Sequence, residues 1–379
     1  MVVCGYQCAK WEDFGTVITW FAKEFENDVF NRIKAFFSYD ESGLYDLLRR
    51  YRFCKSTEAV DTVYAILGLA SDIKKESFVI DYSLSAREVF CKMATDWIRQ
   101  NSSLDIFGDC ENTYHSLATN PRDKDRVPSW APDWSVPLLN TTFRKHRTAD
   151  REGQSLSVPM YSASAGTPPV LIDIDDRSLI CLRGFTITTI SQVSTSNMNW
   201  DDSWCIPDTG FFISAPDSSV FLFNESVEDK MGDRIAPSMK KCAFARILIA
   251  DMLSNRRAPE SIAKVYDCWR RKKEKSPREQ GLAEDELLSA LAYDLSVSAA
   301  TSERRLFVSL DQRMGLVPNA AREGDVICVL FGGQMPLVLR PKREFFELIG
   351  EAYVYGIMDG EAMQDLEAGK YHEQDFVLQ

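Results

Sequence analysis

Apolar side chains recur at steps of three and four along the first hundred residues, the spacing that is typical of amphipathic helices. The longest such row predicts one helix over residues 11–37. Its members are Trp11, Phe14, Ile18, Phe21, Phe25, Val29, Ile33 and Phe36. A shorter row, formed by Leu44, Leu47, Leu48 and Tyr51, predicts a second helix over residues 41–52.

Capping residues mark the ends of two more helices in this region. One is predicted over residues 57–67, with a cap at residues 56–57 and an end at Gly68, since glycine readily adopts the left-handed conformation after a helix. The next begins after Ser85, because Ser85 and Glu88 have the spacing of a capping box. The first hundred residues are therefore predicted to be a helical assembly.

The chain loses this periodicity between residues 101 and 168. Two tryptophans, Trp130 and Trp134, lie in a segment too rich in proline for a helix interior, so we expect an ordered loop strapped across the helices. An alternative is that the two rings form a recognition surface. Residues 138–168 are rich in Thr, Ser, Gly and Pro, which favours a linker.

Short runs rich in β-branched residues replace the helical period after the linker and predict strands. The predicted strands are 170–174, 179–190, 306–310, 326–331, 336–339, 345–350 and 352–357, and the predicted helices between them are 239–256, 260–273 and 283–297. Closely spaced strands with glycine turns indicate a small antiparallel β-sheet or a partly closed barrel. The expected fold class is α+β.

These patterns predict a division of the chain into successive parts. The parts are a helical region over 1–137, a linker over 138–168, a β-subdomain over 169–358 interrupted by a helical insertion at about 194–300, and a tail over 359–379.

Composition narrows the possible partners. The chain has 379 residues and a formal net charge of −12, which disfavours a nucleic-acid surface because phosphate binding needs clustered lysine and arginine. No apolar run approaches the length that spans a bilayer, so no membrane partner is expected. We expect a cytoplasmic chain whose partner is another protein, and a small-molecule ligand remains open.

Ten cysteines and three histidines are scattered without the close spacing of a zinc site, so neither a metal nor a cofactor is expected. His115, near Cys110 and Glu111, leaves a Cys/His nucleophile pair as one hypothesis, although a third orienting group would be needed. Gly332 and Gly333 do not have the spacing of a phosphate-binding loop.

Residues 56–70 and 81–83 carry the most specific pattern in the chain. The run from Asp61 through Tyr64 to Gly68, followed by Asp81 and Tyr82, resembles the central signature of the fungal heterokaryon incompatibility (HET) family, usually Asp-Pro-Arg-Asp-Lys-Val-Tyr-Ala-Leu-Leu-Gly-Leu. Further segments, at 127–135, 313–318, 324–330 and 350–361, resemble family segments in the expected order. The resemblance assigns as family residues Asp61, Tyr64, Gly68, Asp81, Tyr82, Trp130, Trp134, Gly324, Asp325, Gly350, Tyr353, Gly356, Asp359 and Gly360.

The resemblance covers the region that normally follows the HET domain proper. That domain has been compared with the TIR fold, is presumed to trigger cell death when unlike fungal strains fuse, and normally opens with a Ser-Tyr-x-Trp-Gly element. Neither this element nor the later Asn-Gln element occurs in the chain, so no effector or nucleotide-cleaving residue is assigned. We therefore expect the back half of a larger protein. Within the signature, Ala59, Val60, Asp61 and Thr62 replace Pro-Arg-Asp-Lys and remove a basic pair.

Acidic residues offer several hypotheses for chemistry. Asp61 either orients Arg49 or Arg50 or lies in the first turn of a helix, where a negative charge is favoured. Asp359 and Glu361, with Glu351 nearby in sequence, are either an acid/base pair or cation site or solvated carboxylates at the exit of a strand. Asp173, Asp175 and Asp176 are expected to make local hydrogen bonds in a hairpin turn.

The resemblance implies a protein of fungal self/nonself recognition that lacks the effector domain and acts as a non-catalytic binding or regulatory module. The alternative is an enzyme or accessory factor acting on an apolar small molecule, for example in fungal secondary metabolism. A non-functional gene fragment is a third possibility.

Overall fold

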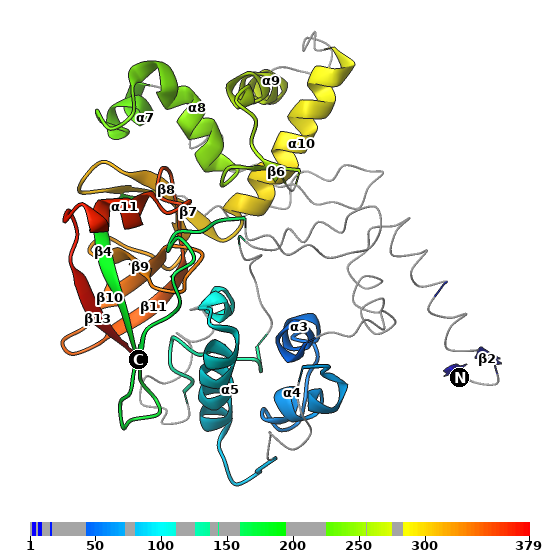
Figure 1. Cartoon of the computed structure of the whole chain (residues 1–379). Helices are drawn as coiled ribbons and strands as arrows, with labels where there is room; N and C mark the ends of the chain where they lie inside the picture. Colours follow the sequence, from blue (N-terminus) through cyan, green and yellow to red (C-terminus); the bar gives the residue numbers. More distant parts are fainter. Residues whose placement is uncertain are drawn as a thin grey trace. The chain divides into compact units, whose positions relative to one another are not determined.

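The computed structural model describes residues 2–4, 7–9, 16, 43–72, 80–110, 126–136, 143, 160–194, 225–254, 256–274 and 283–379 (Figure 1). The predicted helix over 11–37, most of the predicted linker, and Glu111 and His115 lie outside these residues. Two compact units are present. Unit 1 contains Met1–Ser83, Trp134–Pro137 and Trp200–Pro216, and unit 2 contains Leu84–Asp133, Leu138–Asn199 and Asp217–Gln379. The domain boundaries predicted at residues 137, 168 and 358 stay predictions.

Unit 1 contains short elements. Strands β1 (Val2–Cys4) and β2 (Gln7–Ala9) pair antiparallel, and three leucines of helix α3 (Leu44–Arg50) are buried. Helix α4 (Asp61–Tyr64) is only one turn long and is followed by a 3₁₀ turn, η1 (Leu67–Leu69).

The predicted cap and end of the helix over 57–67 are wrong. Ser56 donates its hydroxyl to the carbonyl of Glu58, and α4 begins instead after Val60, whose side chain cannot cap a helix. Gly68 lies inside η1 and does not adopt a positive φ. The local bonds of the 56–60 turn therefore shorten the helix that the apolar spacing predicts.

The predicted capping box of the fourth helix is confirmed in unit 2. Helix α5 (Ala86–Asn101) begins after Ser85, whose hydroxyl accepts from the Glu88 amide while the Glu88 carboxylate accepts from the Ser85 amide. Val89, Phe90, Met93 and Ile98 are buried, and Trp97 is half-buried. A 3₁₀ turn, η2 (Asp105–Asp109), follows it.

Nine described strands of unit 2 form one sheet. They are β3 (Leu171–Ile172), β4 (Ile180–Val193), β7 (Arg304–Ser309), β8 (Met314–Pro318), β9 (Val326–Leu330), β10 (Leu337–Pro341), β11 (Phe346–Glu351), β12 (Tyr353–Val354) and β13 (Glu373–Leu378). Successive pairings β4–β13, β13–β11, β11–β10, β10–β9 and β9–β4 return to β4, so the path is ring-like. Among the described strands only β11 and β13 pair parallel, which confirms a mostly antiparallel α+β fold.

Strand β4 closes this path because its two edges pair with different strands. The amide and carbonyl of Arg183 bond to Val170 and Phe331, on the edge shared by the β3 segment and β9. The opposite edge pairs with β13 over the first half of β4 and with β7 over the second half. Two register shifts in β4, next to Thr186 and Ile190, accompany the change of partner.

Gly184 allows β9 to approach β4 closely. A Cβ atom at Gly184 would lie 2.3 Å from the carbonyl oxygen of Val329. Apolar side chains then form a cluster in the ring, and its members include Phe185, Ile187, Ile190, Phe307, Val329, Val338, Ile349 and Val354.

The segment over 359–379, predicted as a tail, contains helix α11 (Glu361–Glu367) and strand β13. β13 pairs with six residues of β4, beside which it runs in Figure 1. Phe376 and Leu378 are fully buried, so the last residues belong to the sheet.

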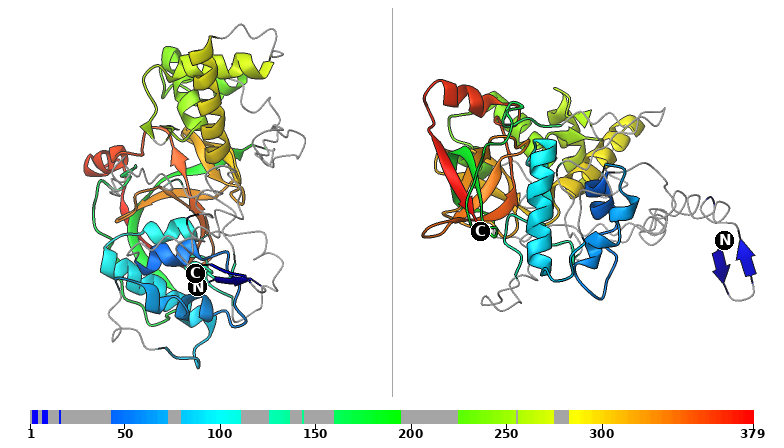
Figure 2. Two further views of the ribbon diagram at one scale, coloured as in Figure 1. Left: turned by 90° about the vertical axis from the view of Figure 1, so that its right-hand side faces the viewer. Right: turned by 60° about the horizontal axis from the view of Figure 1, so that its bottom comes forward.

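A helical insertion separates β4 from β7. Its described elements are α7 (Glu225–Lys230), α8 (Pro237–Leu248), β5 (Met252–Leu253), β6 (Arg256–Arg257), α9 (Ile262–Glu274) and α10 (Glu284–Thr301), which Figure 2 shows from two directions. α8 ends at Leu248 instead of continuing to 256, because Ala250 and Asp251 adopt left-handed φ angles of 46° and 59°.

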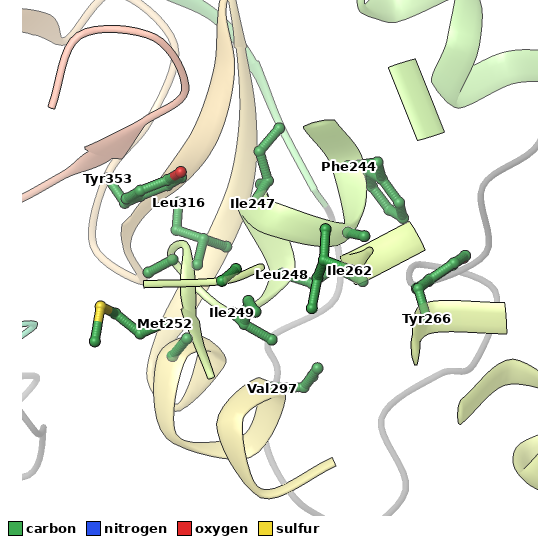
Figure 3. Packing of buried hydrophobic residues seen from close by; sticks show 14 of the residues in the cluster. Phe244, Ile247, Leu248, Ile249, Met252, Ile262, Tyr266, Val297, Leu316 and Tyr353 are labelled. Atoms are coloured by element: carbon green, nitrogen blue, oxygen red, sulfur yellow. The ribbon is translucent and has the colours of Figure 1, made fainter. Parts of the chain in front are cut away.

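The insertion and the strands share one apolar core. Phe244, Ile247 and Leu248 of α8 lie in the same cluster as Leu316 of β8 and Tyr353 of β12 (Figure 3). Among the described residues, no helix is both long enough and apolar enough to cross a bilayer.

The Gly184→Ala variant is expected to lose about 1–3 kcal/mol of unfolding free energy, because the added methyl group forces β4 and β9 apart. Urea titration followed by far-ultraviolet circular dichroism measures this loss. Gly68→Ala is the matched control, since nothing lies within 4 Å of its added Cβ and φ is not positive. A Gly184→Ala variant as stable as wild type would contradict the close strand approach.

Candidate functional site

The tyrosines and aspartates assigned by the family resemblance lie in three separate places. Asp61, Tyr64, Asp81 and Tyr82 meet in unit 1. The other two groups, around Asp325 and around Asp359, lie in unit 2.

In unit 1 the two halves of the central signature, residues 56–70 and 81–83, are joined by hydrogen bonds. The Tyr82 hydroxyl donates to Asp61 Oδ1 (2.9 Å), and the Tyr64 hydroxyl donates to the Asp81 carbonyl (3.0 Å). The two tyrosine rings pack edge to face at 5.3 Å. Asp81 accepts from the hydroxyl and the amide of Ser83, which lowers the pKa of its carboxyl group, while the bond to Asp61 raises the pKa of Tyr82.

Asp61 therefore has a structural role. It opens α4, as the first-turn interpretation predicts, and its carboxylate fixes the loop that carries Tyr82. Tyr82 itself is 64% exposed. Ile80, which lies two residues before it, and Leu69, near the end of the first half of the signature, are also exposed. The signature thus ends in an apolar and aromatic surface rather than a buried reactive group.

The two tryptophans are buried, which favours the strap interpretation over a recognition surface. Trp130 packs in unit 2, where its indole N–H donates to the Ser178 carbonyl (3.0 Å) and its carbonyl accepts from the Cys110 thiol. Trp134 is buried in unit 1, where Arg52 Nε donates to the nearby Val136 carbonyl (2.9 Å).

Gly324 and Asp325 form the turn into β9. Gly324 adopts a φ of +86°, and the Asp325 side chain is only 2% exposed. Arg340 of β10 donates to both of its oxygens from Nε and Nη2 (2.9 Å each), and the Arg322 amide adds a third bond. This buried pair ties the β9 turn to β10.

The third place is a charge cluster of Arg246, Asp251, Arg257 and Asp359. Arg246 comes from the end of α8, Asp251 from the left-handed turn after it, Arg257 from β6 and Asp359 from the loop before α11. Arg246 pairs with one oxygen of Asp251, and Arg257 Nη1 pairs with the other (3.0 Å). Arg257 Nη2 also pairs with Asp359, so one guanidinium joins the insertion to the loop that follows the sheet.

Two buried tyrosines lie beside this charge cluster. The Arg257 guanidinium stands 4.8 Å from the centre of the Tyr161 ring, which packs against Tyr353 at 6.1 Å. The Tyr161 hydroxyl donates to the Ala250 carbonyl, which helps to hold the left-handed turn. Burial raises the pKa of both phenols, so they remain neutral donors.

Burial also raises the pKa of Asp359, an effect that Glu361 and Asp251 reinforce and that the Arg257 charge only partly offsets. A perturbed carboxyl group beside buried phenols is a common feature of functional sites. In this cluster, however, two arginines face two aspartates, so the formal charges cancel. The arrangement is a neutral cross-link between α8, the β5–β6 hairpin and the loop before α11.

The predicted acidic trio does not form one site. Glu361 accepts from the Asp359 backbone amide (2.8 Å) at the start of α11, and Asp359 pairs with Arg257. Glu351 is buried, so its interpretation as a solvated carboxylate is wrong. No group of His, Cys, Asp or Glu within the described ranges could hold a metal ion.

The remaining sequence candidates have local roles. Asp176 accepts from the hydroxyl and amide of Ser178, as predicted for the turn. Asp173 pairs at the surface with Arg99 (3.2 Å). Gly332 has a φ of +85°, and a Cβ there would lie 2.6 Å from Pro169, so this glycine serves backbone packing.

Sequence reasoning missed a second charge cluster, centred on Asp311 in the turn between β7 and β8. Its carboxylate accepts from Thr188, Ser309, Arg313 Nε (3.0 Å) and Arg234 Nη2 (2.8 Å). Burial disfavours the charged form, but the hydroxyl bonds and the two guanidinium groups outweigh it and lower the pKa of Asp311. The Asp-x-Arg spacing in a hairpin turn was its signal.

Comparison with known proteins points to one family. Residues 226–378, from α7 through β13, match the family described as the Het-6 beta-barrel domain. The chain is 24% identical over 369 residues to heterokaryon incompatibility protein 6, OR allele, of Neurospora crassa. That alignment covers 85% of this chain and 51% of the relative, so the chain spans about half the length of the curated relative. No solved structure matches the chain significantly.

Removing one partner of the buried Asp325–Arg340 pair should unfold unit 2 more easily. Asp325→Ala is expected to cost about 3–5 kcal/mol, because it leaves the Arg340 guanidinium buried without its carboxylate. The control is Asp375→Ala, which breaks an exposed two-bond pair with Arg183 between β13 and β4 and should have a much smaller effect. Equal losses in urea titrations would contradict the role assigned to Asp325.

Two arginine-paired aspartates should respond to pH in opposite directions. The pKa of Asp311 is lowered on folding, so its stabilising contribution is present above the unfolded value of 3.8 and is lost as pH falls through the folded pKa. The pKa of Asp359 is raised, so its contribution is present below 3.8 and is lost as pH rises through the folded pKa.

Asp311→Asn should therefore destabilise the chain at neutral pH, with an effect that fades in acid. Asp359→Asn should not destabilise it at neutral pH, although it loses an ion pair. Unfolding free energies of both variants across the acid range measure this, and the same sign for both at neutral pH would contradict it.

Proposed function

We propose that this chain, which is a relative of the heterokaryon incompatibility proteins, acts in fungal self/nonself recognition as a binding or regulatory module without catalysis of its own. Homology supports the role in fungal incompatibility. The observation that carries the proposal is that similarity to the Neurospora protein extends over 85% of the chain, well beyond a single motif.

The roles of the family residues support the finer part of the proposal. Asp61 bonds to Tyr82, Asp325 to Arg340, and Asp359 to Arg257. Each of these carboxylates fixes a loop to a neighbouring element. Residues that maintain loop geometry are what a module needs when its surface, rather than a reacting group, carries the function.

The exposed side of the signature offers such a surface in unit 1. Tyr82 combines a large, rigid ring with a hydroxyl that Asp61 orients, and aromatic side chains of this kind often dominate the affinity of protein interfaces. Tyr82→Ala is therefore a variant that should impair recognition while leaving unit 2 folded.

Heterokaryon formation tests the proposal directly. A divergent form of this gene placed in one of two otherwise identical strains is expected to block stable fusion, and the same gene with an early stop codon is expected to permit it. Tyr82→Ala should permit fusion as the stop codon does. Stable fusion regardless of the alleles would contradict a role in recognition.

A separate assay tests the non-catalytic part. The purified chain is expected to leave NAD and nucleoside triphosphates unchanged. Turnover that one point substitution abolishes, in a variant as stable as wild type, would overturn that part and leave the strain assay to decide the rest.

A further inference from the structure

Helix α10 has two apolar faces, although a surface helix normally needs only one. The inner face packs on α9 and the rest of the insertion through buried side chains, namely Ala290, Tyr293, Asp294, Val297 and Thr301. Asp294 on this face accepts from the Trp269 indole (2.8 Å) and pairs with Lys273 (3.0 Å), which fixes the rotation of the helix against α9.

An exposed side of the helix carries a row of leucines, the outer leucine row, formed by Leu287, Leu288, Leu291 and Leu295. Leu288 and Leu295 are 61% and 53% exposed, and the steps from 288 to 291 to 295 place three of them on one line. Four of the eleven exposed large hydrophobic residues in the described part of the chain lie on this one helix, so the row is not a scatter of single side chains.

The charged residues of α10 itself are all acidic, and basic residues of α9 pair with two of them. The charged residues of α10 are Glu284, Asp285, Glu286 and Asp294, with no lysine or arginine. Glu286 pairs with Arg271 of α9 and Asp294 faces inward, whereas Glu284 and Asp285 are exposed. Glu284 lies one turn before Leu288, so the leucine line ends in a carboxylate.

A second copy of the chain fits this surface poorly. Two α10 helices paired in parallel would bring Glu284 and Asp285 of both copies together, and in either orientation each copy carries a formal charge of −12. The row extends over little more than two turns, whereas a stable interface buries about 800 Å² on each side. Charge and size favour a single helix as the occupant.

We propose that the outer leucine row is the docking site of a partner's amphipathic helix, with apolar residues at steps of three and four and lysine or arginine at the end beside Glu284 and Asp285. The leucines of the row would pack against the apolar face of the partner helix. The carboxylates of Glu284 and Asp285 would set the orientation of that helix by pairing with its basic end. The biological role of this docking site rests on the proposed function, and the site specifies the chemistry of one partner.

A synthetic peptide probe tests the site on the full chain. The probe is a helical peptide with leucines at that spacing and lysines at one end. Two further peptides serve as comparisons, one with glutamates in place of the lysines and one with the same composition in scrambled order. Affinities are measured by fluorescence anisotropy at two salt concentrations.

The wild-type chain is expected to bind the lysine peptide and to bind the other two at least about tenfold more weakly. Leu288→Gln and Leu295→Gln, which keep good helix formers in α10, should each weaken binding about tenfold or more. The matched control is Leu310→Gln, because Leu310 is 72% exposed but lies in the β7–β8 turn. Glu284→Gln with Asp285→Asn should reduce the preference for lysine over glutamate peptides.

Equal binding of the scrambled peptide, or row variants that bind like wild type while remaining folded by circular dichroism, would overturn the proposal. Self-association that Leu288→Gln abolishes in sedimentation experiments would assign the row to a second copy and would also overturn it. The strain assay of the proposed function does not use these peptides, so either proposal can fail while the other survives.

Discussion

The two-sided pairing of β4 is the constraint on which unit 2 depends. One edge of β4 pairs with β9, and the other edge pairs with β13 and then with β7. Strand β4 therefore joins the strands on both sides of the helical insertion to the last strand of the sheet. This pairing needs a residue without a side chain at Gly184, where the β9 backbone approaches. It also needs the end of the chain, because Phe376 and Leu378 bury themselves against β4. Unlike a hairpin, such a ring cannot form from neighbouring residues alone, and its closure pays the entropy of long loops.

Charged groups fix the loops around this ring. Asp325 with Arg340, Asp311 with two arginines, and the Arg246–Asp251–Arg257–Asp359 cluster each join elements that are distant in sequence. Such pairs contribute specificity because a carboxylate inside a protein tolerates few positions other than one beside its guanidinium. The pKa shifts of Asp311 and Asp359 have opposite directions because two effects compete. At Asp311 the cost of burial is outweighed by hydrogen bonds and arginine charges, whereas at Asp359 burial outweighs the Arg257 charge. The aspartates among the family residues are thus explained by loop placement, and exposed apolar side chains remain at Tyr82 and on α10.

The family resemblance predicted many residues of the candidate site, but the sequence did not predict which residues they contact. The resemblance selected Asp61, Tyr82, Asp325 and Asp359, and all four make the polar contacts described above. Their partners were not expected, since Arg340 and Arg257 lie 15 and 102 residues away in sequence and carry no local pattern. The Asp311 cluster had one local signal, the Asp-x-Arg spacing to Arg313, whereas Thr188 and Arg234 come from distant parts of the chain.

The sequence by itself determined the local elements whose stability comes from neighbouring residues. The capping box at Ser85, the apolar row from Leu44 to Leu48 and the β-branched runs of the strands each depend on side chains within a few positions, so they were predictable and are present among the described residues. Tertiary structure decided where α8 stops, since the distant Tyr161 hydroxyl holds the turn after it, and that residues 373–378 form a strand of the ring rather than a tail. Those outcomes depend on contacts with residues that are distant in sequence. A local sequence pattern cannot identify such contacts, because they form only when the chain folds.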